Sequence, residues 1–161
     1  MGQSTQSSQL SINPRSRVVV IRAEYNEAIT RALLTGCLHR LEELGLPAAH
    51  IVTLEVPGAY ELPLAAKWSL QASLRPDAVI VLGAVIRGDT AHFDYVCDSV
   101  TQGCTRLQLD AGVPIVFGVL TCDTLAQAIA RIGGAHGHKG IEAADTAAAM
   151  LALRHRVLGD Q

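Results

Sequence analysis

The sequence predicts an α/β domain: a three-layer α/β/α sandwich in which a four-stranded parallel sheet carries helices on both of its faces. Two observations support this prediction. Short runs of β-branched and aliphatic residues alternate with longer segments of helical periodicity, and the composition combines 49% hydrophobic residues with only 17% charged ones. Strands that alternate with helices form right-handed βαβ units, and the sheets of such units are covered on both faces. A covered sheet and contacts between subunits are the two ways in which this chain of 161 residues can hide its apolar surplus.

Four runs have the length and composition of strands. They are rich in Val, Ile or Leu and are too short to form helices. None approaches the ~18 consecutive apolar residues that a membrane-spanning helix needs. The predicted strands are Val18–Ile21, His50–Glu55, Ala78–Leu82 and Ile115–Leu120.

Apolar residues at spacings of three and four predict a helix after the first, the third and the fourth strand. Gly45 and Pro47 end the first of these helices. A last, alanine-rich helix is predicted from about Ile141 to Val157, with cations in its final turn that suit a helix C-terminus. The marker residues are Ile29, Leu33, Cys37, Leu41 and Leu44 in the first helix, Val96, Val100, Cys104 and Leu107 in the second, and Leu125, Ile129 and Ile132 in the third.

We expect a single domain over residues 16–161, preceded by a flexible Ser/Gln-rich tail at 1–15 that resembles neither a signal peptide nor a membrane anchor. The balance of 13 basic and 15 acidic residues creates no field that would attract a nucleic acid or a membrane. The four cysteines form no C-x-x-C pair and are expected to be reduced core thiols. These features favour a cytoplasmic protein with neither a nucleic acid nor a membrane as partner.

The ligand crevice of an open parallel sheet lies at the carboxyl ends of its strands. Four segments follow predicted strands and therefore contain the candidate site residues: 23–26, 56–61, 83–92 and 121–131.

The segment 83–92 leaves a strand, contains two glycines and enters a helix. Its outline is that of a P-loop, but Asp89 stands where the lysine is required, so binding of a nucleoside triphosphate is not expected. Backbone N–H groups at a helix start still favour a phosphate, although a simple glycine turn is an equally good interpretation. His92, in the first helical turn, is expected to be neutral and suited to proton transfer, or else to be a cap or surface residue.

The other segments have similar paired interpretations. Arg131 and Lys139 flank a glycine-rich turn that can close over an anion, and its H-x-H pair fits a helix–helix connection better than a metal site. Glu61 can accept hydrogen bonds from a polyol or can lie in a first helical turn. Tyr25 and Asn26 can stack on and orient a flat ring, but Asn26 is equally a helix N-cap.

Taken together, these segments resemble lumazine synthases, and the resemblance runs from Arg17 to about Leu153. The segments that carry it are VPGAYELP at 56–63, GAVIRGDTAHFDYV at 83–96, and the R-x7-K-G pattern formed by Arg131, Lys139 and Gly140. The resemblance implies a flavodoxin-like version of the three-layer fold, small-molecule substrates, no cofactor, no metal, and self-association into a homopentamer or a larger pentamer-based assembly.

The family's reaction condenses 5-amino-6-(D-ribitylamino)uracil with 3,4-dihydroxy-2-butanone 4-phosphate to 6,7-dimethyl-8-ribityllumazine, phosphate and water in riboflavin biosynthesis. The resemblance implies that His92 transfers protons and that the phosphate is bound by Asp89, Thr90 and Arg131. It also implies that Phe117 reaches the site of a neighbouring subunit. The residues expected at the aminouracil are Tyr25, Asn26, Ala59, Tyr60, Glu61, Ala84, Val85, Ile86, Phe117 and Lys139.

Three positions depart from the family pattern. Tyr25 stands where phenylalanine or tryptophan is common, but a tyrosine can still stack. Glu24 stands where an arginine is common and His138 where an asparagine is, so the local electrostatics differ. The alternatives to an enzyme of this family are a non-catalytic flavin or lumazine binder, a shell-forming homologue, or another doubly wound domain of the receiver or flavodoxin type.

Overall fold

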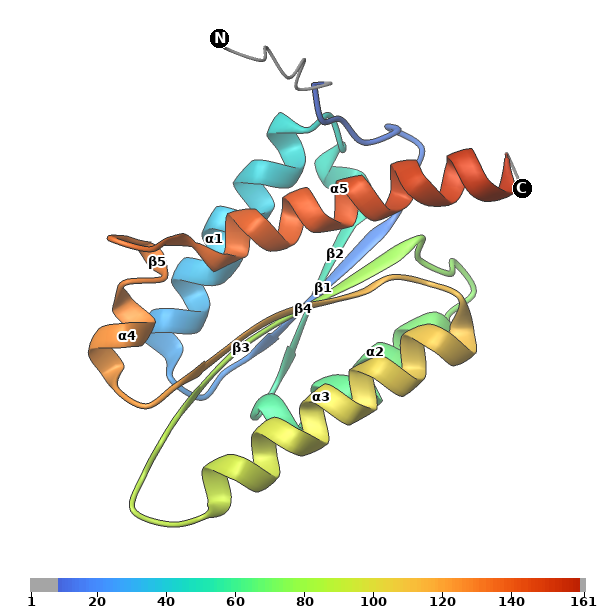
Figure 1. Ribbon diagram of the computed structural model, residues 1–161. Coiled ribbons are helices and arrows are strands. Elements are labelled where there is room, and N and C mark those ends of the chain that lie inside the picture. Colours follow the sequence, from blue (N-terminus) through green and yellow to red (C-terminus); the bar gives the residue numbers. More distant parts are fainter. Residues whose placement is uncertain (1–8, 160–161) are drawn as a thin grey trace, which may run out of the picture.

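A computed structural model, which describes residues 9–159, consists of a four-stranded parallel sheet between two layers of helices (Figure 1). The strands lie in the order β2-β1-β3-β4, and every neighbouring pair is parallel. The predicted three-layer α/β/α architecture is confirmed. The strands are β1 (Val18–Ala23), β2 (Ile51–Val56), β3 (Ala78–Ile86) and β4 (Ile115–Cys122).

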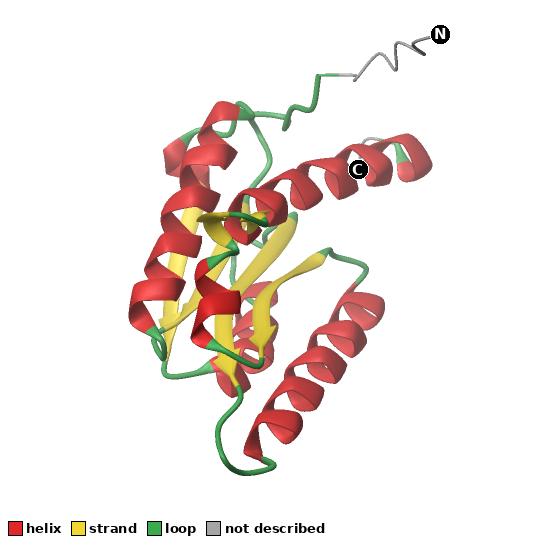
Figure 2. Cartoon of the chain, turned by 60° about the vertical axis from the view of Figure 1, so that its left-hand side comes forward, coloured by secondary structure: helices red, strands yellow, loops and turns green. Residues whose placement is uncertain are grey.

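The helices divide between the two faces of the sheet (Figures 1 and 2). One face is covered by α1 (Glu27–Glu43), α4 (Leu125–Ile129) and α5 (Lys139–Leu158), and the other by α2 (Leu62–Leu70) and α3 (His92–Ala111). The short elements are the 3₁₀ turns η1 (Ala48–His50) and η2 (Ala59–Glu61) and the antiparallel strands β5 (Ile132–Gly134) and β6 (Gly137–His138).

The apolar run of β1 is explained by this double cover. Val18 and Val20 pack into the core beneath α1 and α5, whereas Val19 and Ile21 pack into the core beneath α2 and α3. Successive side chains of a strand point to opposite faces, so a strand that is buried on both faces has no polar alternation. The short continuous runs of Val, Ile and Leu therefore predicted these central strands correctly.

The end of the third strand was predicted too early. The sequence suggests a turn from Gly83, but β3 continues to Ile86, where it pairs with Cys122 at the end of β4. The glycine belongs to the strand because it leaves room for the layer of α2: an added Cβ would lie 3.3 Å from the Leu62 side chain. The connection to α3 consequently begins at Arg87.

The third predicted helix was too long. It ends at Ile129, and Ile132, which was assigned to its apolar face, lies in β5 instead. The glycine-rich turn that follows is a small hairpin rather than a loose connection, because Ile132 pairs with His138 across it. Gly133 and Gly137 have φ values of 102° and 81°, which explains why glycines are needed there.

The described part of the N-terminal segment contacts the domain. Ile12 is buried, and its backbone N–H donates to the carbonyl of Leu44 at 2.8 Å. Of the predicted flexible tail at 1–15, residues 1–8 lie outside the described residues, and residues 9–15 include this contact.

All four cysteines are free thiols, and three of them are buried. Burial raises the pKa of Cys37 to about 12 and that of Cys104 to about 11, which keeps both thiols protonated. Within residues 9–159 there is no helix with the length and apolar composition needed to cross a membrane.

Gly140 fixes the crossing of α1 and α5, and its replacement gives the first test. It is buried in the first turn of α5, and an added Cβ would collide with the backbone carbonyl of Leu33 in α1. We expect Gly140→Ala to lower the free energy of unfolding by about 1–3 kcal/mol, because backbone cannot move aside as a side chain can. Gly88→Ala is the matched control for stability, since an added Cβ there meets nothing within 4 Å. Equal denaturation midpoints for the two variants would contradict this packing.

Candidate active site

The loops after β1 and β2 are joined to each other beyond the sheet. The N–H of Glu24 donates to the carbonyl of Val56 at 2.8 Å, and that of Tyr25 donates to the carbonyl of Pro57 at 3.1 Å. Two of the segments singled out from the sequence therefore lie side by side. Tyr25 and Tyr60 expose 75% and 62% of their surfaces, so both rings are available to a ligand.

Asn26 joins the third segment to this pair. It has a left-handed backbone with φ 57°, and its side-chain Nδ2 donates to the carbonyl of Ala84 in β3 at 2.8 Å. Asparagine tolerates this conformation better than most residues. Asn26 stands at the N-cap position of α1, which was one of the two interpretations of the sequence, but its side chain makes no capping bond and instead binds the neighbouring strand. It thus ties the loop of Tyr25 to the end of β3.

Residues 58–61 form a tight turn that presents Glu61. Its Oε2 accepts a hydrogen bond from the N–H of Gly58 at 3.0 Å, and it lies in η2 just before α2. Ala59 is buried beneath the turn and Tyr60 is exposed. Among residues 9–159, the second carboxylate oxygen of Glu61 has no hydrogen-bond partner, which leaves it able to accept from a hydroxyl group.

The loop at 87–91 leads from β3 into α3, which begins at His92 as predicted. Asp89, Thr90 and His92 are all exposed, and Thr90 Oγ1 accepts from the N–H of His92 at 3.3 Å. These three predicted site residues therefore lie in one short stretch of accessible backbone at the start of a helix, where an anion is favoured.

Arg87, which we did not select from the sequence, fastens this loop. Its Nε donates to Asp123 at 2.8 Å, its two Nη atoms donate to Asp94 at 3.3 and 3.1 Å, and its guanidinium lies 4.2 Å from the ring centre of Phe93. It connects the ends of β3 and β4 with the first turn of α3. Its position within the segment 83–96, seven residues before Asp94, is the only sequence signal for this role.

Arg131 and Lys139 meet at a different carboxylate. The two Nη atoms of Arg131 donate to Glu142 at 2.8 and 2.6 Å, and Lys139 Nζ lies 3.9 Å from the same group. Arg131 also donates to the carbonyl of His136 in the hairpin. The hydrogen bonds that Arg131 donates to Glu142 lower the pKa of the carboxyl group and raise the pKa of the guanidinium. Within residues 9–159, no hydrogen bond or ion pair joins these cations to the loop at 87–91.

His138, one of the departures from the family pattern, has a structural role. Its Nδ1 accepts the N–H of Ile141 at 3.4 Å at the start of α5, and its ring packs against Gly36 of α1. Among residues 9–159, no group of three or more His, Cys, Asp and Glu side chains is arranged to hold a metal ion.

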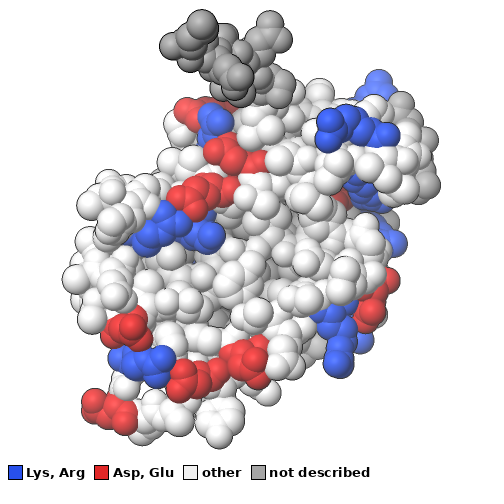
Figure 3. Space-filling view, in the orientation of Figure 1, with Lys and Arg blue, Asp and Glu red and all other residues white. Residues whose placement is uncertain are grey.

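Phe117 lies within β4, an edge strand of the sheet, and is half-buried. Figure 3 shows that the surface over β4, between α5 and α3, is largely uncharged, with positive and negative groups gathered along its margins. An uncharged surface beside an edge strand is typical of a contact face.

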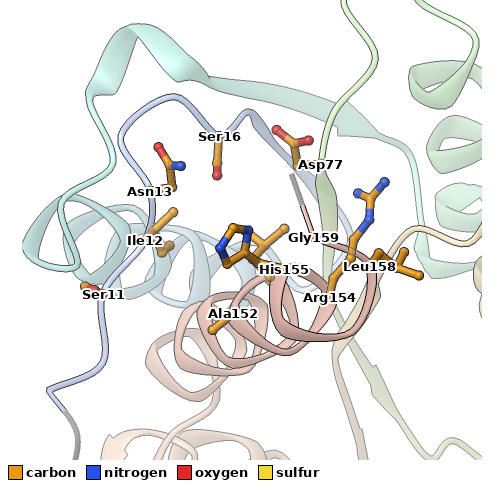
Figure 4. A pocket seen from close by; sticks show the side chains of 11 residues that line it. Ser11, Ile12, Asn13, Ser16, Asp77, Ala152, Arg154, His155, Leu158 and Gly159 are labelled. Atoms are coloured by element: carbon orange, nitrogen blue, oxygen red, sulfur yellow. The ribbon is translucent and has the colours of Figure 1, made fainter. Parts of the chain in front are cut away.

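A pocket lies near the amino ends of β1 and β3, and none of the predicted site residues lines it. Asn13, Ser16 and Asp77, which come just before β1 and β3, face Arg154 and His155 of α5 across it (Figure 4). The predicted site residues thus lie away from this pocket, and Tyr25, Tyr60 and His92 are exposed beyond the carboxyl ends of the strands.

Comparison with known proteins gives a consistent result. The profile of a family described as 6,7-dimethyl-8-ribityllumazine synthase matches residues 15–155. Proteins of that name from Coxiella burnetii (strain CbuG_Q212) and Porphyromonas gingivalis are each 48% identical to this chain, covering 88% and 85% of it and 93% and 84% of their own lengths. The protein of that name from Streptomyces avermitilis is 49% identical over 88% of this chain and 86% of its own.

The bond from Asn26 to β3 can be tested by reversing its polarity. In Asn26→Asp a carboxylate oxygen faces the Ala84 carbonyl in place of the donor, and we expect the free energy of unfolding to fall by about 1–3 kcal/mol. Asn26→Gly is the matched control, because it keeps the positive φ and only deletes the bond, so it should lose less. Chemical denaturation measures both, and an Asp variant as stable as the parent would show that the bond is unimportant.

Proposed function

The chain belongs to the 6,7-dimethyl-8-ribityllumazine synthase family, and from this premise we propose how its residues divide the work of the reaction. Its function is the condensation of 5-amino-6-(D-ribitylamino)uracil with 3,4-dihydroxy-2-butanone 4-phosphate in riboflavin biosynthesis, which makes it a transferase. The observation that carries this conclusion is the match to the family profile over residues 15–155. The segments of the sequence that resemble the family form the carboxyl edge of one sheet, which supports the same conclusion.

The chemistry needs no protein nucleophile, because the amine of the pyrimidine attacks the carbonyl of the phosphate substrate. Imine formation, loss of phosphate and ring closure then require the two substrates to be held together and protons to be moved. His92, exposed at the start of α3, is the proton donor and acceptor. The Thr90 hydroxyl accepts a hydrogen bond from the backbone N–H of His92 and so fixes the loop at 87–91 to the start of α3.

The aminouracil binds where the loops after β1, β2 and β3 are tied together. Tyr25 offers an exposed ring on which the pyrimidine stacks, and Glu61 keeps one carboxylate oxygen for the ribityl chain. Asn26 acts from its bond to Ala84 and so orients the loop rather than the ligand. The backbone of Ala84, Val85 and Ile86 holds the ring edge.

The phosphate group binds to the backbone at Asp89 and Thr90 and to Arg131. The amide of Asp89, and not its carboxylate, faces the anion, because two negative charges repel. Lys139, which the resemblance places at the aminouracil, shares the single carboxylate of Glu142 with Arg131, so the two cations keep one net positive charge for binding substrate.

We further propose that the site is completed between subunits. Phe117 on the edge strand β4 and the uncharged surface around it support contact with a second copy of the chain. The charged fraction of 17% is low for a monomer and supports the same arrangement. The assembly is a homopentamer or a larger body built from pentamers, and the protein acts in the cytoplasm.

A steady-state assay separates the two assigned roles. Mixing the protein with both substrates and following lumazine absorbance and released phosphate should give a rate above the spontaneous reaction. We expect His92→Ala to lower kcat by about 10²-fold or less, because loss of a proton-transfer group removes only part of the rate enhancement. Arg131→Ala should chiefly raise KM for the phosphate substrate.

Unchanged kinetic constants in both variants would refute these roles, and a parent rate equal to the spontaneous reaction would refute the enzymatic function itself.

Dilution tests the shared site. If Phe117 completes the site of a neighbour, specific activity should fall at concentrations where light scattering or native mass measurement reports monomers. Phe117→Ala should lower activity at high concentration without abolishing assembly. A stable and fully active monomer would contradict the proposal.

A further inference from the structure

Arg22 is a charged residue in the middle of an apolar strand. It lies in β1, exposes only 1% of its side chain and is the largest of the fully buried side chains among residues 9–159. A buried guanidinium is costly unless its donors are paired, and core strands rarely carry one. Its presence here calls for a physical reason.

The contacts of Arg22 reach two other elements. One Nη donates to Glu55 in β2 at 2.5 Å, and the other donates to the hydroxyl of Thr30 in α1 at 3.1 Å. The Nε has no partner among residues 9–159 although it is buried. The hydrogen bond from Arg22 lowers the pKa of Glu55, so the ion pair is formed at neutral pH.

Stability alone does not account for this arrangement. Glu55 is 51% exposed and gains little from the pair, while the buried guanidinium loses its hydration and leaves one donor unsatisfied. Replacing a buried ion pair by an apolar side chain of similar volume is often neutral or stabilising. The pair is therefore better explained by what it holds in position.

The contacts of Arg22 lie next to the point where β1 ends and the loop that carries Tyr25 begins. Arg22 and Glu55 are directly opposite each other in the sheet, one residue before the last pair, Ala23 and Val56. The two chains then stay together through the bonds of Glu24 to Val56 and of Tyr25 to Pro57. Thr30, the second partner of Arg22, lies in α1 four residues after Asn26 and donates its hydroxyl to the carbonyl of Glu27 at 3.4 Å.

We propose that Arg22 is a positioning residue for the pyrimidine substrate. It fixes the relative position of β1, β2 and α1 at the point where the loop of Tyr25 and the turn of Glu61 leave the sheet. This inference rests on the proposed function, since it assumes that these two loops hold the aminouracil. The contacts of Arg22 do not reach the loop at 87–91 or the cluster of Arg131, so the phosphate substrate is held independently of it.

Arg22→Met tests the proposal, because methionine fills a similar volume without charge. We expect KM for the aminouracil to rise about five- to tenfold, less than the ~100-fold cost of a full 1 Å misplacement. KM for the phosphate substrate should change less than about twofold, and the melting temperature should not fall, since the buried charge is removed. A change confined to one substrate is not produced by a general loss of stability.

Two further variants keep the test informative if Arg22→Met folds poorly. Glu55→Gln removes the anionic partner from an exposed position and should raise KM for the aminouracil in the same way. Arg40→Met is the matched control, because it deletes an arginine of α1 that donates to Asp145 at 2.7 Å near the far end of that helix. It should leave both KM values unchanged.

The outcomes are distinguishable. Unchanged KM values in Arg22→Met and Glu55→Gln, or equal increases for both substrates together with a lower melting temperature, would overturn the proposal while leaving the enzymatic function intact. A parent protein without activity would instead refute the proposed function and this inference with it.

Discussion

The burial of β1 and β3 on both faces is the constraint from which the rest of the structure follows. Every residue of β1 is buried, and the strand has β2 and β3 as neighbours on either side. A strand enclosed in this way cannot place a polar group along its length without a partner, so polar groups concentrate where it ends. The candidate site residues that follow β1, β2 and β3 lie at the carboxyl ends of these strands, because that is the first position at which the central strands leave the core. Arg22 is the exception, and it is paired with two neighbours.

Periodicity predicted the four strands and the helices α1, α3, α4 and α5, because it reports burial on one or both faces, but it did not predict α2. It failed where the same residue type is common in two kinds of secondary structure. Gly83 was interpreted as the start of a turn, yet it lies in β3 and gives space to Leu62. Ile132 continued a helical spacing but pairs across a hairpin with His138. In both places the deciding partner comes from a distant part of the chain, so a local pattern could not reveal it.

The sequence predicted which segments form the candidate site, but it did not predict which side chains in them contact one another. The order of segments after strands identified Tyr25, Glu61 and His92 correctly as residues of the carboxyl edge, since strand ends must gather there. The sequence could not predict that the Asn26 amide donates to the carbonyl of Ala84, or that Arg87 bridges two aspartates. Such contacts depend on side-chain directions across neighbouring strands, which no spacing along the chain encodes.

Because β3 extends further than β1, the carboxyl ends of these two neighbouring strands are offset, which forms a step in the sheet. The pairing of β3 with β1 ends at Leu82, whereas its pairing with β4 continues to Ile86, so its last residues have a strand on one side only. The Asn26 amide already takes one carbonyl on the open side. A flat heterocycle that lies along this step would be recognised by main-chain donors and acceptors in the place of a missing strand. Its recognition would then depend on the path of the backbone, and substitutions at these positions would act through the size of the side chain rather than through its chemistry.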